Sequence, residues 1–463
     1  MSALHWLTAS EIAAAYRAKE LSPVELVQSL IARVGEVDRK LNAFIALDAE
    51  AALDAARAAE KDISRGQARG PLHGIPVGVK DIIDVAGQAT TCHSKIRLGH
   101  KAKEDAECIR RLRGAGAIPF GRLSLHEFAI GGPSFDLPFP PARNPWQRRH
   151  HPGGSSSGSG SALAAGMVPL ALGTDTGGSV RNPAGACGIV GLKPTYGLVS
   201  RRGVFPLSFT LDHVGPMARS VGDIALMLDA MAGYDAGDPG STRSETVAYT
   251  SELERGVRGL RIGFVRHFHE SDLPADPEMA AAIDGAARTL KSEGAVLHDV
   301  MLPPLTLYSG VQRTVMLSES WAIHAKWLRE RPGDYGALAR RRLMGGAFLS
   351  AGDYVHAQQR RGGLIAAVND ALRDADVLLV ANAMDPACAI DDEEAVARTY
   401  PRQARNVFNL TGHPAIALPA GLSKSGLPLS IQLVGRVLDE VTLLRAAAAF
   451  ERATEWHRRH PPL

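Results

Sequence analysis

Two glycine-rich segments hold the serines of this sequence that could carry out covalent chemistry. Residues 153–161 consist only of glycine and serine, and residues 173–179 lead from an apolar run to Ser179. Glycines allow successive backbone N–H groups to face one cavity, where they can bind the oxyanion that forms when a hydroxyl attacks a carbonyl. The second segment therefore predicts acyl transfer with Ser179 as the nucleophile, although a tight glycine turn with a capping serine has the same sequence.

The first segment has two other interpretations. Glycine-serine runs are usually flexible linkers, but apolar residues follow this run closely at 162–165 and 168–172, which favours an active-site loop. The stretch 154–158 also matches G-x-S-x-G, the nucleophile elbow of α/β-hydrolases. That elbow needs a buried strand before it, whereas residues 146–152 are polar and end in proline. We therefore interpret the run as one half of an active site.

A serine nucleophile needs a base, and histidine is the usual one. The sequence has 16 histidines, none in a pattern that singles it out. Four of them are interpreted as exposed or packing residues: His73, His126, His150 and His151. Lys80 instead ends the apolar run 75–79, and a lysine in a dry site can be neutral near pH 7 and accept a proton. The alternative for Lys80 is a surface ion pair with Asp81.

The segments around these residues alternate between helix-like and strand-like patterns. The sequence from Ser22 to Glu25 predicts the capped start of an amphipathic helix. Further helices are predicted at 51–63, 105–112, 221–232, 277–292 and 441–450. Strands are predicted at 75–79, 168–172, 260–265, 295–297, 377–381, 415–418 and 429–434. This alternation predicts an α/β fold with a large mixed, mostly parallel central sheet covered by helices on both faces.

The composition excludes several function classes. The chain has 463 residues, 45% of them apolar, and a formal net charge of +3 from 52 basic and 49 acidic side chains. That balance gives no field typical of a nucleic-acid binder. No window reaches the roughly 20 uninterrupted apolar residues of a membrane span, and the opening residues lack a signal-peptide pattern. We expect a cytoplasmic protein with neither nucleic acid nor a membrane as partner.

The four cysteines indicate a reducing compartment and no metal centre. Cys92, Cys108, Cys187 and Cys388 lie far apart, form no C-x-x-C pair and have no histidine at metal-ligand spacing. We therefore expect neither a metal nor a cofactor.

Four motifs, in order and spacing, resemble those of the amidase signature family, serine hydrolases with a Ser-cisSer-Lys triad. The motifs lie at 74–81, 153–158, 173–184 and 188–197. The resemblance extends from the N-terminal helices to 426–435, nearly the whole chain. Length alone would favour two to four domains. The resemblance instead implies one domain, 1–463, with an N-terminal helical segment at 1–65 and a helical, pocket-lining insertion at 305–350.

The resemblance also assigns a role to each residue of the expected site. Ser179 takes the position of the nucleophile, Ser155 that of the bridging serine after a cis peptide bond, and Lys80 that of the base. The bridging serine would take the proton of the nucleophile, pass its own to the neutral lysine and later return it to the leaving amine, and water would repeat the cycle. The expected oxyanion hole comprises the N–H groups of Thr176, Gly177, Gly178 and Ser179. Three residues are expected to support the site: Ser156, Asp175 and Arg181.

The implied reaction is hydrolysis of a linear carboxamide or a urea-type C–N bond, with a small-molecule amide and water as partners and a homodimer as the assembly. The alternative is the A subunit of the tRNA-dependent glutamine amidotransferase, which works within a complex. In that protein, the amino group of glutamine is held by an acid seven residues before an Asn-Leu-x-Gly-x-Pro segment. Here the segment begins at Asn409, and that position holds Arg402. A cation cannot bind an ammonium group, so a stand-alone amidase is favoured.

A non-catalytic scaffold is disfavoured, because all three triad positions are intact. The pocket walls are expected from two variable segments, 126–142 and 305–350. Arg402 and Arg405 are candidates to meet an acidic or carbonyl-rich substrate. Four aromatic residues indicate an apolar or aromatic acyl site, unless they belong to the core: Tyr308, Trp321, Trp327 and Phe348.

Overall fold

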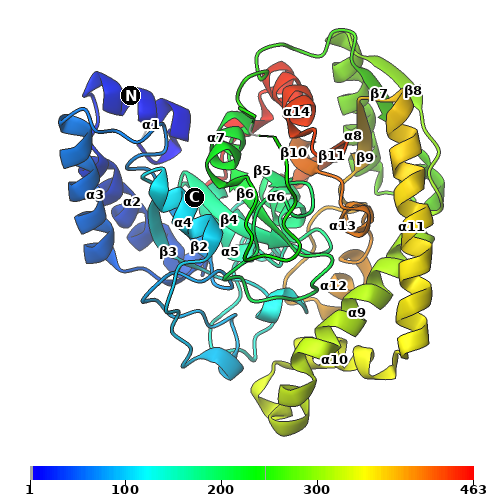
Figure 1. The fold of residues 1–463 in the computed structure, drawn as a ribbon. Helices are drawn as coiled ribbons and strands as arrows, with labels where there is room; N and C mark the ends of the chain where they lie inside the picture. The colour runs from blue at the N-terminus through cyan, green and yellow to red at the C-terminus, as the bar shows by residue number, and fades with distance from the viewer. Residues whose placement is uncertain (1–3, 246) are drawn as a thin grey trace.

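An eleven-stranded mixed sheet forms the centre of the computed structural model, which describes residues 4–245 and 247–463 (Figure 1). The strands follow the order β1-β3-β2-β4-β6-β5-β10-β11-β9-β7-β8. Their bounds are β1 Phe44–Ala46, β2 Pro76–Lys80, β3 Ile118–Leu123, β4 Leu170–Asp175, β5 Val190–Lys193, β6 His213–Ala218, β7 Arg261–Phe264, β8 Val296–Asp299, β9 Val377–Ala381, β10 Ala415–Leu422 and β11 Pro428–Gly435. The expected α/β class with a large mixed sheet is confirmed.

The strand directions differ from the expectation of a mostly parallel sheet. Of the ten pairings that the described residues form, six are antiparallel and four are parallel. The parallel pairs form two blocks, β3-β2-β4 and β9-β7-β8, and the pairings between these blocks are antiparallel. A strand buried on both faces is a continuous apolar run in either direction, so the sequence pattern alone could not separate the two cases.

Helix starts follow the capping signals of the sequence in most places. Helix α2, Pro23–Val37, begins after Ser22, and the two residues Ser22 and Glu25 form a reciprocal capping box. Helix α4, Glu107–Gly114, starts two residues later than predicted, because the Asp105 carboxylate accepts the N–H of Ala86 instead of capping the helix. The other helices are α1 Ala9–Ala18, α3 Ala49–Ser64, α5 Ser157–Ala164, α6 Arg181–Cys187, α7 Val221–Met231, α8 Pro277–Ser292, α9 Leu305–Glu330, α10 Ala337–Met344, α11 Ala351–Asp374, α12 Glu393–Thr399, α13 Asn406–Thr411 and α14 Glu440–Thr454.

Helices cover both faces of the sheet. Strands β4, β6 and β9 are buried at every residue. Because successive side chains of a strand point to opposite faces, this burial requires cover on both. In one layer α4, α7, α14 and α8 each contact the next, whereas α5 and α6 pack together against central strands. Helices α1 to α3 flank the β1–β3 edge (Figure 1).

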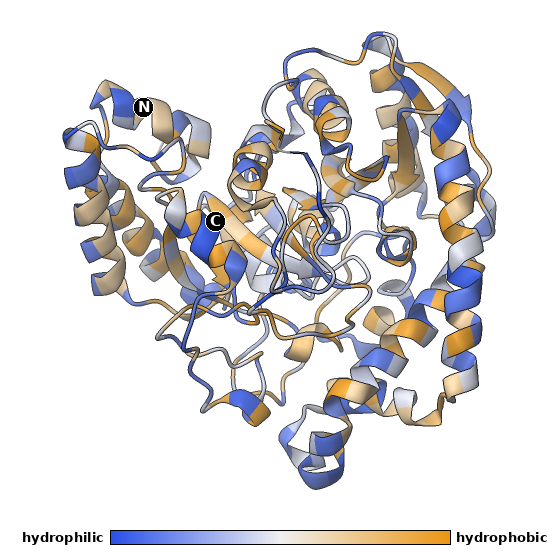
Figure 2. Ribbon diagram, in the orientation of Figure 1, coloured by the Kyte–Doolittle hydropathy of each residue, from blue (hydrophilic) through white to orange (hydrophobic). Residues whose placement is uncertain are grey.

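Two long helices stand toward the other edge of the sheet. Helices α9 and α11 contact each other, α11 also contacts β7, and α9 contacts α13 (Figure 1). Polar and apolar residues alternate along α11, as expected of a helix with one face on the protein (Figure 2). Most of 305–350 is therefore helical, and its first helix, α9, lies beside α13. Among the described helices, none combines the length and the apolar character needed to cross a membrane.

Candidate active site

The expected base, Lys80, lies at the end of a buried central strand. It is the last residue of β2, and its side chain is fully buried. Its Nζ donates to Ser155 Oγ and to Thr174 Oγ1, both at 2.8 Å. Desolvation lowers the pKa of Lys80 from 10.5 to about 7, against the opposing charges of Asp175 and Asp212. Near neutral pH a substantial fraction of this lysine is therefore uncharged and able to accept a proton.

The loop before α5 presents Ser155 to the lysine. The peptide bond between Gly154 and Ser155 is cis, as the family resemblance implied. The carbonyl of Ser155 accepts the N–H of His126 at 3.0 Å. Next to it, the N–H of Ser156 donates to the carbonyl of Ser179 at 3.1 Å, and the Ser156 hydroxyl donates to the Thr174 carbonyl at 3.3 Å. Ser156 thus joins the two glycine-rich segments, which places Ser155 and Ser179 on one side of the site.

A buried ion pair braces the loop that carries Ser179, between β4 and α6. Asp175 and Arg181 are fully buried, with Oδ1 and Nη2 3.0 Å apart. The Asp175 carboxylate also accepts Asn409 Nδ2 at 2.8 Å and the N–H of Gly178 at 2.7 Å. Burial by itself would raise the pKa of Asp175, but Arg181 and the Asn409 hydrogen bond hold it well below its usual range. Asp175 is therefore an anion throughout the neutral range and sets the shape of the loop.

The N–H groups of this loop divide into two sets. The N–H of Gly178 is engaged with Asp175, so the expectation that it belongs to the oxyanion hole is corrected: it is part of the brace. Within residues 4–245 and 247–463, the N–H groups of Thr176, Gly177 and Ser179 donate to no protein acceptor. The carbonyl of Thr176 accepts Gln312 Nε2 from α9 at 3.2 Å, which holds the loop from the opposite side. Three loop N–H groups therefore remain available to an oxyanion.

Ser155 and Ser179 open onto a cavity of about 630 Å³. Both segments expected to form its walls contribute, residues 126 and 129–131 from the first and parts of α9 and α10 from the second. The four aromatic residues expected at an acyl site are absent from this lining within the described chain. Tyr308 is fully buried, Phe348 is 85% exposed, and Trp321 and Trp327 pack on the hydrophobic core. Of the two interpretations, the acyl site is therefore not supported for these residues, and the core interpretation holds for all but Phe348.

The two arginines that were candidates for substrate contact lie in different places. Arg402 Nε pairs with Asp385 Oδ2 at 2.7 Å, and Arg402 does not line the cavity. Arg405 is buried, lines the cavity and packs against Gly178 of the nucleophile loop. Of the two, only Arg405 can reach a bound substrate.

Thr174 was not anticipated at the site, and His126 was anticipated only as part of the wall segment 126–142. Thr174, the second partner of the Lys80 ammonium, lies on β4 next to β2, a position that the strand prediction at 168–172 stopped short of. His126 was interpreted as an exposed or packing residue, but it is buried and lines the cavity beside Gly154. Burial lowers the pKa of His126 well below its usual value, and the charge of Lys80 lowers it further. The ring is therefore neutral at the site.

A second cavity of about 410 Å³ adjoins the first and shares Ala129, Thr176 and Leu207 with it. Asp212 lines this second cavity and accepts Thr176 Oγ1 at 2.6 Å. Burial raises the pKa of Asp212 to about 6, although its hydrogen bond from Thr176 lowers it. Asp212 therefore holds the nucleophile loop at Thr176 from the side of the second cavity.

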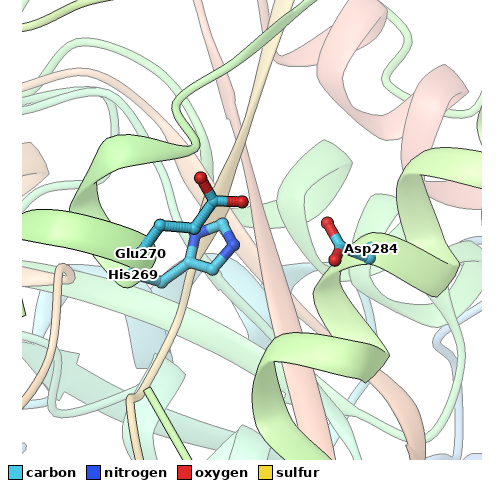
Figure 3. A group of neighbouring side chains, drawn as sticks. All are labelled: His269, Glu270 and Asp284. Carbon is cyan, nitrogen blue, oxygen red and sulfur yellow. The ribbon is translucent and has the colours of Figure 1, made fainter. Parts of the chain in front are cut away.

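Another cluster of titratable side chains lies apart from the cavity. His269, Glu270 and Asp284 offer ligand atoms within 4.8 Å of one another (Figure 3). Arg266 Nη1, however, lies 3.1 Å from Glu270 Oε1 and 2.9 Å from Asp284 Oδ1. Because the Arg266 guanidinium already pairs with both carboxylates, we do not assign a metal site to this cluster.

Comparison with known proteins agrees with this geometry. A family model described as Amidase matches residues 25–444. Over 491 aligned residues the chain is 39% identical to the A subunit of the glutamyl-tRNA(Gln) amidotransferase of Chloroflexus aggregans, covering 100% of this chain and 99% of the relative. It is 41% identical to an amidase of Pseudomonas putida, with 100% and 99% covered. The native peptide amidase of Stenotrophomonas maltophilia superimposes with a TM-score of 0.87 at 32% identity, covering 98% of each chain.

Proposed function

This chain belongs to the amidase signature family, and we propose that it hydrolyses the C–N bond of a linear carboxamide or urea-type substrate through an acyl-enzyme on Ser179. One observation carries the proposal. A fully buried lysine with a pKa of about 7 donates to Ser155 Oγ, and Ser155 lines the same cavity as Ser179. A serine nucleophile needs a base that is neutral at working pH, and Lys80 meets that need through desolvation.

In the proposed acylation step, neutral Lys80 accepts the Ser155 hydroxyl proton while Ser155 accepts the proton of Ser179. The Ser179 oxygen forms a bond to the substrate carbonyl carbon, and the carbonyl oxygen becomes an oxyanion. The N–H groups of Thr176, Gly177 and Ser179 are the proposed donors to that oxyanion. When the C–N bond breaks, the proton returns through Ser155 to the leaving nitrogen, which departs as ammonia or an amine.

In deacylation, water takes the place of the amine. Its proton passes to Lys80 through Ser155 while its oxygen attacks the ester carbon. Collapse of the second tetrahedral intermediate returns the proton to Ser179 and releases the carboxylic acid. No cofactor takes part in this scheme.

A second candidate function is the A subunit of a glutamine amidotransferase, favoured by the 39% identity to the Chloroflexus aggregans protein over its full length. Two features argue against it. Arg402, at the position where the amidotransferase A subunit is expected to carry an acid, is paired with Asp385. The cavity lining of the described chain contains no aspartate or glutamate that could receive the ammonium group of glutamine. We therefore prefer a stand-alone amidase.

The choice can be tested with the purified chain alone. The proposal expects Ser179 to be labelled by a fluorophosphonate probe, and expects release of ammonia or amine from one or more members of a panel of linear, aryl and urea-type amides. Glutaminase activity that appears only with tRNA and partner proteins would instead establish the amidotransferase function. Full activity of a Ser179→Ala variant would contradict both.

We also propose that the protein is a cytoplasmic homodimer. The free thiols of Cys92, Cys108, Cys187 and Cys388 support a reducing compartment. Light scattering on the purified protein tests the dimer, and fractionation of cells that express it tests the compartment.

A further inference from the structure

We propose that the amide substrate carries a carboxylate, which is bound by a cluster of cavity arginines centred on Arg342. This inference rests on the proposed hydrolase function and specifies its substrate class. The cluster comprises Arg313, Arg341, Arg342 and Arg405. The chemistry that recognises the substrate is a charge-assisted, bidentate contact between a guanidinium group and a carboxylate.

The charged side chains that line the described part of the cavity are all positive. Four arginines line it, and the described part of the lining contains no aspartate or glutamate. Arginines elsewhere at this site are paired, as Arg181 is with Asp175 and Arg122 with Asp81. Among residues 4–245 and 247–463, no carboxylate lies within 4.0 Å of any of the four cavity guanidinium groups. The cavity therefore presents positive charge without an internal counter-ion.

Three of the arginines lie close enough to repel one another. Arg341 and Arg342 are consecutive on α10, and Arg313 comes from α9. Arg342 is half-buried; burial lowers its pKa, and the charges of Arg341 and Arg313 lower it further, although Tyr400 opposes them. Partial desolvation of an unpaired cation next to like charges costs free energy. A bound carboxylate would offset that cost, whereas a neutral group in its place would not.

The fourth arginine, Arg405, brings the positive charge of the cluster up to the nucleophile loop. Arg405 is 3% exposed, and its Nη1 donates to the carbonyl of Asn382 at 2.8 Å. Its buried Nε has no hydrogen-bond partner among the described residues. A Cβ atom at Gly178 would lie 2.6 Å from this Nε, so the guanidinium packs directly against the loop of Ser179. The arginines therefore extend along the cavity from α10 to the loop of Ser179. This arrangement suits a short substrate that carries an amide at one end and a carboxylate at the other.

The test compares two amides that differ at one end only. Succinamate carries a carboxylate where butyramide carries a methyl group. We expect wild-type enzyme to hydrolyse succinamate with the higher kcat/KM. The Arg342→Gln variant should lower kcat/KM for succinamate by about 10- to 100-fold, the effect of losing a hydrogen-bonded charge pair, and change that for butyramide by less than about twofold.

Arg340→Gln is the matched control. Arg340 lies on the same helix, is exposed and does not line the cavity, so both amides should keep their wild-type rates. Arg313→Gln is a second test variant in case Arg342→Gln does not fold, and it should show the same selective loss. A loss that is equal for the two amides, or a wild-type preference for butyramide, would overturn the inference and leave the hydrolase proposal standing.

A binding measurement separates this inference from the proposed reaction. Succinate is titrated into the Ser179→Ala protein by calorimetry, with butyramide as the neutral probe. Tighter binding of succinate, weakened about tenfold or more by Arg342→Gln, supports the anion site even if no amide is hydrolysed. Succinate binding no tighter than that of butyramide refutes the anion site whatever the turnover assay shows.

Discussion

Lys80 Nζ donates to Ser155 Oγ over 2.8 Å, although 75 residues separate the two in the chain. Both side chains are almost entirely shielded from solvent. The shielding lowers the pKa of Lys80, whereas a solvated lysine would stay protonated at neutral pH and could not accept a proton.

The pH dependence of the reaction should report the protonation of Lys80. Its pKa is lowered to about 7, and the proposed mechanism requires its neutral form. We therefore expect kcat/KM to rise with pH, pass half its maximum near pH 7 and level off above it. Replacement by alanine should lower kcat by about 100- to 10,000-fold, a typical range for loss of a general base. A wild-type profile that stays flat through neutral pH would exclude Lys80 as the base.

Ser155 should be distinguishable from the other serines of the same run. Ser155→Ala removes the group between Lys80 and Ser179 and should lower kcat by about 100-fold or more. Ser159 is an equally buried serine whose Oγ donates to the Leu172 carbonyl at 2.9 Å. Ser159→Ala should cost about 1 kcal/mol of unfolding free energy but keep most activity. Steady-state kinetics and urea unfolding of both variants decide the matter; equal losses of activity would contradict the assignment of Ser155.

The Asp175–Arg181 pair should stabilise the fold as well as the loop. Arg181→Met leaves a buried carboxylate without its cation and should lower the free energy of unfolding by about 3–5 kcal/mol. The control is Arg57→Met, which breaks an exposed pair with Asp54 and should cost less than about 1 kcal/mol. Urea unfolding at neutral pH measures both.

The same pair should make stability depend on acid pH. The folded-state pKa of Asp175 is depressed, so its contribution is fully present above the unfolded value of about 3.9 and is lost as the pH falls below it. Urea midpoints of the wild type should therefore drop below about pH 4. If Arg181→Met proved as stable as Arg57→Met, the proposed brace would be wrong.

Two neighbouring glycines should respond differently to alanine. Gly178 has φ +119°, and a Cβ there would lie 2.6 Å from Arg405 Nε, so Gly178→Ala should distort the loop and abolish most activity. Gly177 has an ordinary φ, and its nearest neighbour would be the flexible end of Gln312 at 3.2 Å. Gly177→Ala should therefore keep substantially more activity, since alanine retains the N–H proposed for the oxyanion. Kinetics of the two variants under one set of conditions test this; the reverse order would refute the loop geometry.

Much of the site could be predicted from local sequence patterns. The apolar run before Lys80 is a short-range feature that forms the strand its residues favour, whereas the glycine-serine run around Ser155 enters helix α5 at Ser157, which its composition does not favour. The capping box of Ser22 and Glu25 is equally local, and its helix begins where predicted. Strand direction was beyond such patterns, because the apolar run of a fully buried strand is the same in either direction.

What the sequence by itself determined is therefore the set of candidate reacting groups, since the motifs that resemble the amidase signature family point to Lys80, Ser155 and Ser179 without any knowledge of their surroundings. Tertiary structure alone decided what surrounds them. It assigned the N–H of Gly178 to Asp175, turned the expected aromatic residues away from the cavity, and separated Arg402 from Arg405. These outcomes depend on the rotation of each helix against its neighbours and on competition for hydrogen-bond partners among segments far apart in the chain, which no local pattern encodes.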